Sequence, residues 1–245
     1  MVGACVAGRA VMAVPASDEL ERFYASMRIL VGKQGRVPLR DVVQRRDLPV
    51  RGVYFFFDPR ERRGAGEELR VVRVGTHALK RGSRSTLRGR LRQHLGSNSG
   101  RGNHRGSVFR LHVGAALLHR AGLELTTWGV GGSATPGVRL REREHEQLVS
   151  RYMAELEVVT MEVLDEPGPA SLRGYIERNA IALLASEGRR VDPPSPSWLG
   201  HASQRESVRA SGLWNVRHVG DAADGDFLAT LEGLLSAGKP PLARA

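Results

Sequence analysis

The sequence predicts an α/β (α+β) fold: a small, mainly antiparallel three-stranded sheet flanked by helices, with helical N- and C-terminal extensions. Two β-rich runs, 52–57 and 70–77, are separated by a charged loop containing Gly64 and Gly66, which indicates a long β-hairpin. A third run, 157–164, alternates apolar and polar residues as a strand does. Elsewhere apolar residues recur every three or four positions, which is typical of helices that pack against a sheet.

Helical periodicity marks six segments of the chain. The predicted helices span residues 17–32, 87–95, 108–120, 138–156, 172–186 and 227–235. In the second of them, Ser85 or Thr86 is a suitable N-cap, Gly96 is a suitable stop, and leucine recurs at every fourth position. The segments 125–137 and 189–209 are rich in Gly, Pro or Ser, so we expect irregular surface loops there.

At 245 residues the chain is long enough to bury one sizeable core. We expect a flexible tail over 1–16, a helical extension over 17–50, a central domain over 51–220, and a C-terminal helix and tail over 221–245. The single cysteine, Cys5, excludes an intramolecular disulfide and favours a reducing compartment, so a cytoplasmic protein is expected. No apolar run approaches the length of a membrane span, so no membrane association is expected.

The charge of the chain favours a polyanionic partner. The formal net charge is +11, which suits nucleic acid first and an anionic membrane second. Its placement is more informative, because residues 69–123 contain several arginines and histidines but no Asp or Glu. Solvated surfaces normally mix both signs. An acid-free segment of this length therefore predicts a phosphate-binding surface.

A tyrosine, an arginine and a histidine are predicted to meet at one edge of the sheet. Arg90 and His94 are four residues apart, so they neighbour each other on the flank of the leucine stripe in helix 87–95. Tyr54 lies in the first strand of the hairpin. Each residue also has an ordinary interpretation: a core tyrosine, a surface arginine and a structural histidine.

One glutamate on the helix 172–186 stands out. Glu177 has apolar helical neighbours, among them Ile176 and Ala180, so it is expected at the margin of the buried face. A carboxylate there needs a partner or a cation. The spacing alone leaves two interpretations open: an ion pair with Arg173 or simple exposure on the one hand, and a metal ligand on the other.

A second acidic cluster, Glu144-His145-Glu146, lies within helix 138–156. Adjacent helical residues point about 100° apart and do not readily chelate one ion. We therefore expect a solvated helix face here and no metal site.

Two short motifs in a fixed order suggest a family. Gly52-Val53-Tyr54 and Arg73-Val74-Gly75, followed by Arg90 on a helix, resemble the motifs of the GIY-YIG nuclease superfamily over roughly residues 50 to 190. The spacing of Arg90 and His94 is similar to that in its restriction-endonuclease branch. The chain departs from the family pattern in one respect, since Arg73 stands where the family has its second tyrosine.

The resemblance implies a metal-dependent endonuclease that hydrolyses phosphodiester bonds in nucleic acid, double-stranded DNA above all. It implies that Tyr54 activates water, that Arg90 holds the scissile phosphate and that Glu177 binds one Mg²⁺ or Mn²⁺ ion. His94 and His77 become candidates for proton transfer or phosphate contact. The alternative is a catalytically inactive GIY-YIG-like module that only binds nucleic acid.

Further nucleic-acid contacts are expected from basic and polar side chains on the strand, on the arginine helix, in the Gly-rich loop 96–106 and in a late Asn segment. These candidates are Arg73, Arg88, Arg92, Arg101, Asn103, His104, Arg105 and Asn215. No small-molecule organic cofactor is expected, and the sequence leaves the oligomeric state open.

Overall fold

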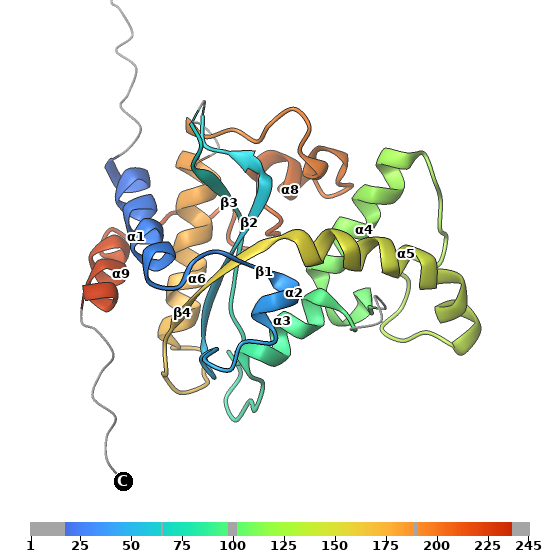
Figure 1. Cartoon of the computed structure of the whole chain (residues 1–245), viewed down its shortest axis with the longest axis horizontal. Helices are drawn as coiled ribbons and strands as arrows, with labels where there is room; N and C mark the ends of the chain where they lie inside the picture. Colours follow the sequence, from blue (N-terminus) through green and yellow to red (C-terminus); the bar gives the residue numbers. More distant parts are fainter. Residues whose placement is uncertain (1–17, 65, 98–101, 189–190, 237–245) are drawn as a thin grey trace, which may run out of the picture.

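The structure is a computed structural model that describes residues 18–64, 66–97, 102–188 and 191–236. A four-stranded antiparallel sheet lies between two layers of helices (Figure 1). The strands are β1 (Val37–Pro38), β2 (Gly52–Arg62), β3 (Leu69–Gly75) and β4 (Glu157–Glu162), in the order β1-β4-β2-β3. The predicted α+β class and the hairpin are confirmed. The fourth strand is β1, a two-residue strand in a segment for which no strand was predicted.

The described residues form six helices close to the predicted ones and two short helices, over 39–42 and 206–211, where none was predicted. They are α1 (Asp18–Gln34), α2 (Leu39–Val42), α3 (Leu87–Leu95), α4 (Val108–Ala121), α5 (Pro136–Glu155), α6 (Leu172–Leu183), α8 (Glu206–Ser211) and α9 (Phe227–Ser236). Three short turns of other helix types complete them: η1 (His104–Gly106), η2 (Leu184–Gly188) and η3 (Leu199–Ala202). The predicted ends of α3 are confirmed, because the Thr86 side chain accepts the Gly89 N–H and Gly96 is the C-cap.

The sheet is covered on both faces, and β2 shows how. Val53, Phe55 and Phe57 face one core, shared with α1, α6 and α9, while Tyr54 and Phe56 face a second core, shared with α2, α3, α4 and α5. Figure 1 shows these two groups of helices on opposite sides of the sheet. Side chains of a strand alternate between faces. Burial of both faces therefore explains why the run 52–57 is continuously apolar.

Two motif glycines are required by contacts between strands. A Cβ atom on Gly52 would lie 2.2 Å from the carbonyl oxygen of Met161 on β4. A Cβ atom on Gly75 would lie 2.3 Å from the Tyr54 hydroxyl, since Tyr54 and Gly75 are paired across β2 and β3. The absence of a side chain at Gly75 therefore makes the space that the Tyr54 ring occupies.

The terminal helices belong to the same core as the central sheet. Arg22 of α1 makes a bidentate ion pair with Glu232 of α9, in which Nε and Nη2 donate to Oε1 and Oε2 at 2.9 and 2.8 Å. The predicted division into 17–50, 51–220 and 221–245 remains a prediction, and the predicted tail 1–16 lies outside the described residues. No helix within the described ranges combines the length and apolar character needed to cross a bilayer.

Two expectations about surface segments were wrong. The described part of 189–209 holds η3 and the start of α8, and Trp198 is only 3 % exposed because it packs 5.5 Å from Trp214. The apolar periodicity of 138–156 predicted a packed helix, but Leu140 and Leu148 of α5 are exposed, whereas Tyr152 and the C-cap residue Leu156 are buried. The N-terminal half of α5 instead buries charged side chains, which are described below.

Gly52→Ala is expected to lower the free energy of unfolding by about 1–3 kcal/mol, because the added methyl group meets a backbone oxygen that cannot move independently of β4. Gly32→Ala is the control, since Gly32 is an exposed residue of α1 with open space around it. Urea unfolding followed by circular dichroism should show unchanged stability or a gain of up to about 1 kcal/mol for that variant. Equal losses in both variants would contradict the inferred strand contact.

Candidate active site

Five of the predicted site residues line a cleft of about 710 Å³. Its lining includes Arg73 from β3, His77 after β3, Arg90 from α3, Glu177 from α6 and Asn215 after α8. These residues lie up to 142 positions apart in the sequence, and they come from both helix layers. Glu177 is the only carboxylate among the lining residues that the structure describes.

Tyr54 and His94 form a buried hydrogen-bonded chain next to this cleft. The Tyr54 hydroxyl lies 2.8 Å from His94 Nε2, and His94 Nδ1 lies 2.8 Å from Ser107 Oγ. With Nδ1 donating to Ser107, Nε2 is left to accept the phenolic proton. Tyr54 is 1 % exposed and His94 fully buried, so both lie beneath the cleft surface. His94 is thus farther inside than the edge position predicted for it, held among Phe56 and Phe109.

Burial and the neighbouring arginines set the protonation of this pair. Burial, together with the positive charges of Arg90 and Arg73, holds the pKa of His94 well below its usual value, so its imidazole is neutral. Burial also raises the pKa of the Tyr54 phenol, while the charges of Arg73 and Arg90 act in the opposite direction. The neutral imidazole therefore orients the phenol by accepting its hydrogen bond, and the charges of the two arginines favour the phenolate form of Tyr54.

Arg73 occupies the position of the second motif tyrosine and is buried. Its Nη1 donates to the carbonyl oxygen of Trp214 at 2.6 Å, and its guanidinium lies 4.7 Å from the centre of the Phe109 ring. Burial lowers the pKa of Arg73, and the electrostatic influence of Tyr54 and Glu177 opposes that shift. The guanidinium therefore adds a fixed positive charge to the lining of the cleft.

Glu177 makes no ion pair with Arg173. Its Oε1 accepts the backbone N–H of Thr76 at 3.1 Å, while Arg173 Nε lies 2.7 Å from Asp165 on another side. Burial raises the pKa of Glu177, and Arg73 and the Thr76 N–H act against that rise. The ion-pair interpretation is therefore wrong.

The donor set around Glu177 fits one hard cation with few protein ligands. Within the described ranges, no three His, Cys, Asp or Glu side chains cluster as a ready-made metal site. Mg²⁺ commonly binds one or two carboxylates and keeps several waters, completed by phosphate oxygens of a substrate. A single carboxylate in an open, arginine-lined cleft matches that pattern.

His77 and Asn215 also line the cleft. The surroundings of His77 set its protonation, and backbone hydrogen bonds hold the Asn215 amide. Burial, together with the charge of Arg173, lowers the pKa of His77 to about 4, so this side chain is neutral at neutral pH. Asn215 accepts the Val74 N–H at 3.1 Å and donates to the Val74 carbonyl oxygen at 2.9 Å. Its amide thus pairs with the edge of β3 as a neighbouring strand would.

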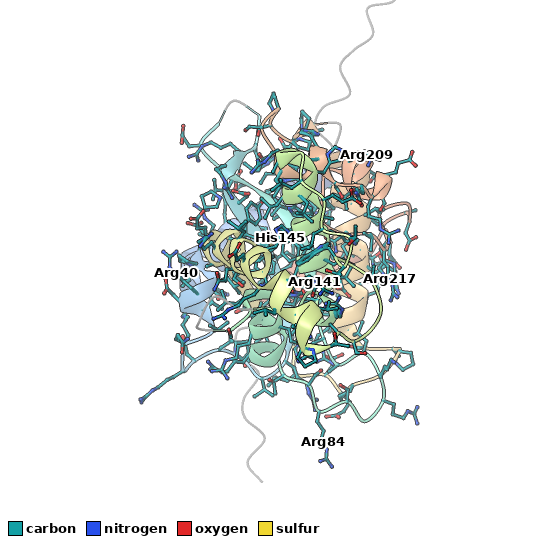
Figure 2. All side chains as sticks on the ribbon, turned by 90° about the vertical axis from the view of Figure 1, so that its right-hand side faces the viewer. Arg40, Arg84, Arg141, His145, Arg209 and Arg217 are labelled. Carbon is teal, nitrogen blue, oxygen red and sulfur yellow. The ribbon has the colours of Figure 1, made fainter. Side chains whose placement is uncertain are left out.

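Other residues predicted to contact nucleic acid lie outside the cleft lining. Arg88 donates to the carbonyl oxygens of Val43 and Arg45, so it fastens α3 to the preceding segment. Arg92 is exposed on α3, and Arg101 lies outside the described residues. Two arginines that were not predicted, Arg84 and Arg217, do line the cleft. Both appear in Figure 2, which views the molecule from the side of α4 and α5.

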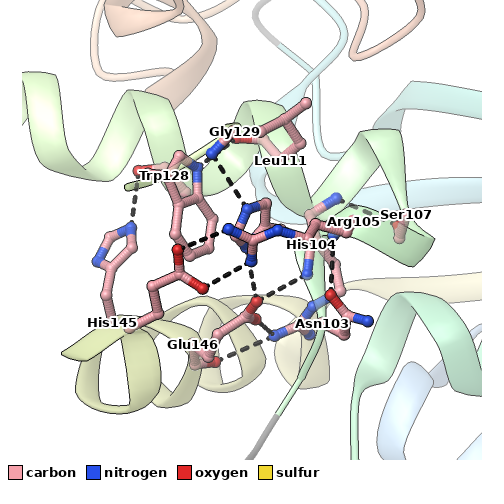
Figure 3. A network of polar contacts seen from close by, with 12 residues as sticks. Asn103, His104, Arg105, Ser107, Leu111, Trp128, Gly129, His145 and Glu146 are labelled. Carbon is pink, nitrogen blue, oxygen red and sulfur yellow. Dashed lines mark hydrogen bonds and ion pairs between the residues drawn. The ribbon is translucent and has the colours of Figure 1, made fainter. Parts of the chain in front are cut away.

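The loop residues His104 and Arg105 belong to a structural network (Figure 3). The backbone N–H and Nδ1 of His104 lie 2.6 and 2.9 Å from Glu146 Oε1, and its ring stacks on Trp128 at 3.8 Å. The two terminal nitrogens of Arg105, Nη1 and Nη2, donate to Oε2 and Oε1 of Glu142 at 2.6 and 2.8 Å. The exposed Asn103 caps this turn by accepting the Arg105 N–H. These bonds hold the loop on α5 and leave the His104 and Arg105 side chains little freedom to bind phosphate.

The same network corrects the expectation for Glu144-His145-Glu146. Glu144 is exposed, but His145 and Glu146 are buried. His145 Nε2 pairs with the Gly114 carbonyl oxygen at 2.9 Å, and Glu146 Oε2 accepts from the fully buried Arg110 at 2.5 Å. The cluster is therefore a packing element, because it neutralises an arginine that comes from a distant helix.

The chain matches the family model of the GIY-YIG domain over residues 15–240. It therefore belongs to the GIY-YIG domain family, whose members are typically nucleases. Comparisons with curated proteins and with solved structures gave no match.

Glu146→Ala is expected to lower the free energy of unfolding by about 3–5 kcal/mol, because it leaves the Arg110 guanidinium buried without its charge partner. Glu144→Ala removes the same side chain two positions away, from the exposed face, and should change stability by no more than about 0.5 kcal/mol. Thermal and urea unfolding of both variants gives the comparison. Similar small effects would mean that the buried network contributes little.

Proposed function

We propose that this chain is a metal-dependent endonuclease that hydrolyses phosphodiester bonds in DNA. The observation that carries the proposal is the convergence of Arg73, Arg90 and Glu177 on one cleft, beside a buried Tyr54–His94 pair. Hydrolysis of a phosphodiester requires activation of water, stabilisation of extra negative charge on the phosphate and neutralisation of the leaving oxygen. The described side chains offer groups suited to the first two requirements.

Arg90 is the principal phosphate ligand in this proposal. Its side chain is half-buried at the cleft, and Nη1 is oriented by the Gln93 amide oxygen at 3.0 Å. A planar guanidinium offers paired donors in a fixed geometry, which suits two oxygens of one phosphate. Arg73 adds a second positive charge to the same cleft. The two arginines together therefore stabilise the more highly charged transition state.

Tyr54 supplies the base. The neutral His94 Nε2 orients the Tyr54 hydroxyl by accepting a hydrogen bond, while the charges of Arg73 and Arg90 favour the phenolate that is left when the phenolic proton passes to solvent. That phenolate takes a proton from the attacking water. Because Tyr54 is 1 % exposed, the proposal requires the arginine side chains to move toward a bound phosphate before water reaches the hydroxyl.

Glu177 would hold the divalent ion, Mg²⁺ or Mn²⁺, which GIY-YIG nucleases typically use. When bound, such an ion supplies positive charge to the phosphate and to the leaving group. The Thr76 N–H orients the Glu177 carboxylate by holding Oε1. The support for metal binding by Glu177 is that a single carboxylate in an open cleft matches the ligand pattern of Mg²⁺.

A catalytically inactive GIY-YIG-like module that only binds nucleic acid is the second candidate. The observation that favours it is Arg73, which replaces a motif tyrosine, together with the burial of Tyr54. Cleavage assays on plasmid and single-stranded DNA with Mg²⁺ or Mn²⁺, against an EDTA control, separate the two functions. DNA binding without metal-dependent cleavage would favour the inactive module.

Arg90→Ala is expected to slow cleavage by about 10²-fold or more, close to 3 kcal/mol in activation free energy, because one preorganised phosphate donor is lost. Arg92→Ala is the matched control, since it removes the same charge from an exposed position on the same helix. The measurement is the single-turnover cleavage rate of a labelled duplex. If both variants lost the same activity, only the overall charge of α3 would matter.

Glu177→Gln is expected to abolish metal-dependent cleavage while preserving metal-free DNA binding, because the amide keeps the size of the side chain but not its charge. Mg²⁺ should also raise the melting temperature of the wild type more than that of the variant, since a ligand of the native state stabilises it. Glu144→Gln, an exposed glutamate on α5, serves as the control. A fully active Glu177→Gln protein would disprove the metal assignment.

A further inference from the structure

His218 is a cleft residue that the sequence analysis did not select. It lies between α8 and α9 and lines the same cleft as Glu177 and Arg90. Among the described residues, only Ala78 and His218 are non-glycine residues with positive φ, at 56° and 64°, and both line this cleft. Left-handed backbone is unfavourable for side chains with a Cβ and tends to cluster at functional sites. The fold therefore holds His218 in a conformation that costs free energy.

A carboxylate fixes the orientation of the His218 ring. Nδ1 lies 2.7 Å from Asp221 Oδ2, and the Asp221 N–H donates to the His218 carbonyl oxygen at 3.3 Å. A carboxylate on Nδ1 keeps a proton on that nitrogen and directs Nε2 away from it. The His218 side chain is 35 % exposed, so a substrate in the cleft can reach it.

His218 and Tyr54 are positioned by different elements, Tyr54 by β2 and His218 by the segment between α8 and α9. Tyr54 packs in the core shared with α3, whereas Val219, next to His218, packs against the core shared with α6. His218 also contributes to the electrostatic surroundings of Glu177, the cleft residue on α6. In a phosphoryl displacement the attacking and leaving oxygens are roughly in line. With Tyr54 as the base, the leaving oxygen therefore needs another proton donor, and His218 is a histidine of the cleft lining whose Nδ1 is held by Asp221 and whose Nε2 is the other ring nitrogen.

We propose that His218 is a catalytic residue that donates a proton to the leaving oxygen, and that Asp221 is its positioning residue. This inference rests on the proposed nuclease function. The bond between the water oxygen and phosphorus forms as the water gives its proton to the Tyr54 phenolate. The bond between phosphorus and the leaving oxygen breaks, its electron pair stays on that oxygen, and the Nε2 proton of the His218 imidazolium moves there. Solvent then reprotonates His218, and Asp221 offsets the ring's positive charge.

The test uses a substrate whose leaving group needs no proton. Mapping the product ends made by the wild type first identifies which bridging oxygen departs. A second duplex then carries sulfur at that position, because a thiolate is a far better leaving group than an alkoxide and departs unprotonated. Single-turnover rates are measured on both duplexes with Mn²⁺ in every reaction.

His218→Gln should lose about 10²-fold or more on the oxygen duplex, the usual contribution of a general acid, and little on the sulfur duplex. Asp221→Asn should show the same selectivity with a smaller loss. His119→Gln, which changes an exposed histidine of α4, should alter neither rate. His218→Gly relieves the left-handed backbone. It should therefore melt at or above the wild-type temperature while losing oxygen-duplex cleavage, which separates chemistry from folding.

Equal losses by His218→Gln on the two duplexes would overturn proton donation, and so would full activity of that variant on the oxygen duplex. A wild-type protein that binds DNA but cleaves neither duplex would instead overturn the nuclease proposal itself. The two failures are therefore distinguishable, because the first leaves wild-type cleavage intact.

Discussion

The packing of the Tyr54 ring against Gly75 is the contact on which the site depends. Because Gly75 has no side chain, the ring can lie across the neighbouring strand, within 2.3 Å of the place where a Cβ would be. This position brings the hydroxyl to His94 on α3, at 2.8 Å. A single pairing within the hairpin thus links the sheet, the arginine helix and the polar chain beneath the cleft.

The acid-free segment divides into two groups of arginines once the fold is known. Arg105 and Arg110 obtain carboxylate partners from α5, and Arg70 pairs with Glu61 on β2. Arg84 and Arg90 line the cleft, where Glu177 is the only carboxylate among the lining residues that the structure describes. The first group stabilises packing, since Arg105 and Arg110 hold η1 and α4 on α5 and Arg70 links β3 to β2. The second group gives the cleft its positive charge.

Local sequence signals predicted the fold well, because they depend on neighbouring residues. The apolar β-rich run of β2 and the cap at Thr86 are of this kind, and both agree with the structure. The failures involve partners that are distant in sequence. Glu146 is buried because Arg110 reaches it from α4, and Trp198 is buried because Trp214 packs on it. No periodicity within α5 or within 189–209 carries that information.

The candidate site was predictable for residues that belong to a recognisable family motif. Tyr54, Arg90 and Glu177 are of this kind, and the fold brings them close together. The burial of the loop histidine His104 was not predictable, since its neighbours in sequence are glycines and polar residues, whereas its partner in space is Glu146. His218 carried a weak signal, an aspartate three residues later. Only the fold shows that this pair borders the cleft.

The two edges of the sheet affect how readily the protein aggregates in concentrated solution. At one edge, β1 is two residues long and ends in Pro38, which cannot donate a backbone hydrogen bond. At the other edge, Asn215 and the backbone of Trp214 already bond to β3. Exposed strand edges are templates for pairing between molecules. With both edges blocked, the apolar strands of this protein are protected against edge-to-edge aggregation while the cleft stays open to solvent.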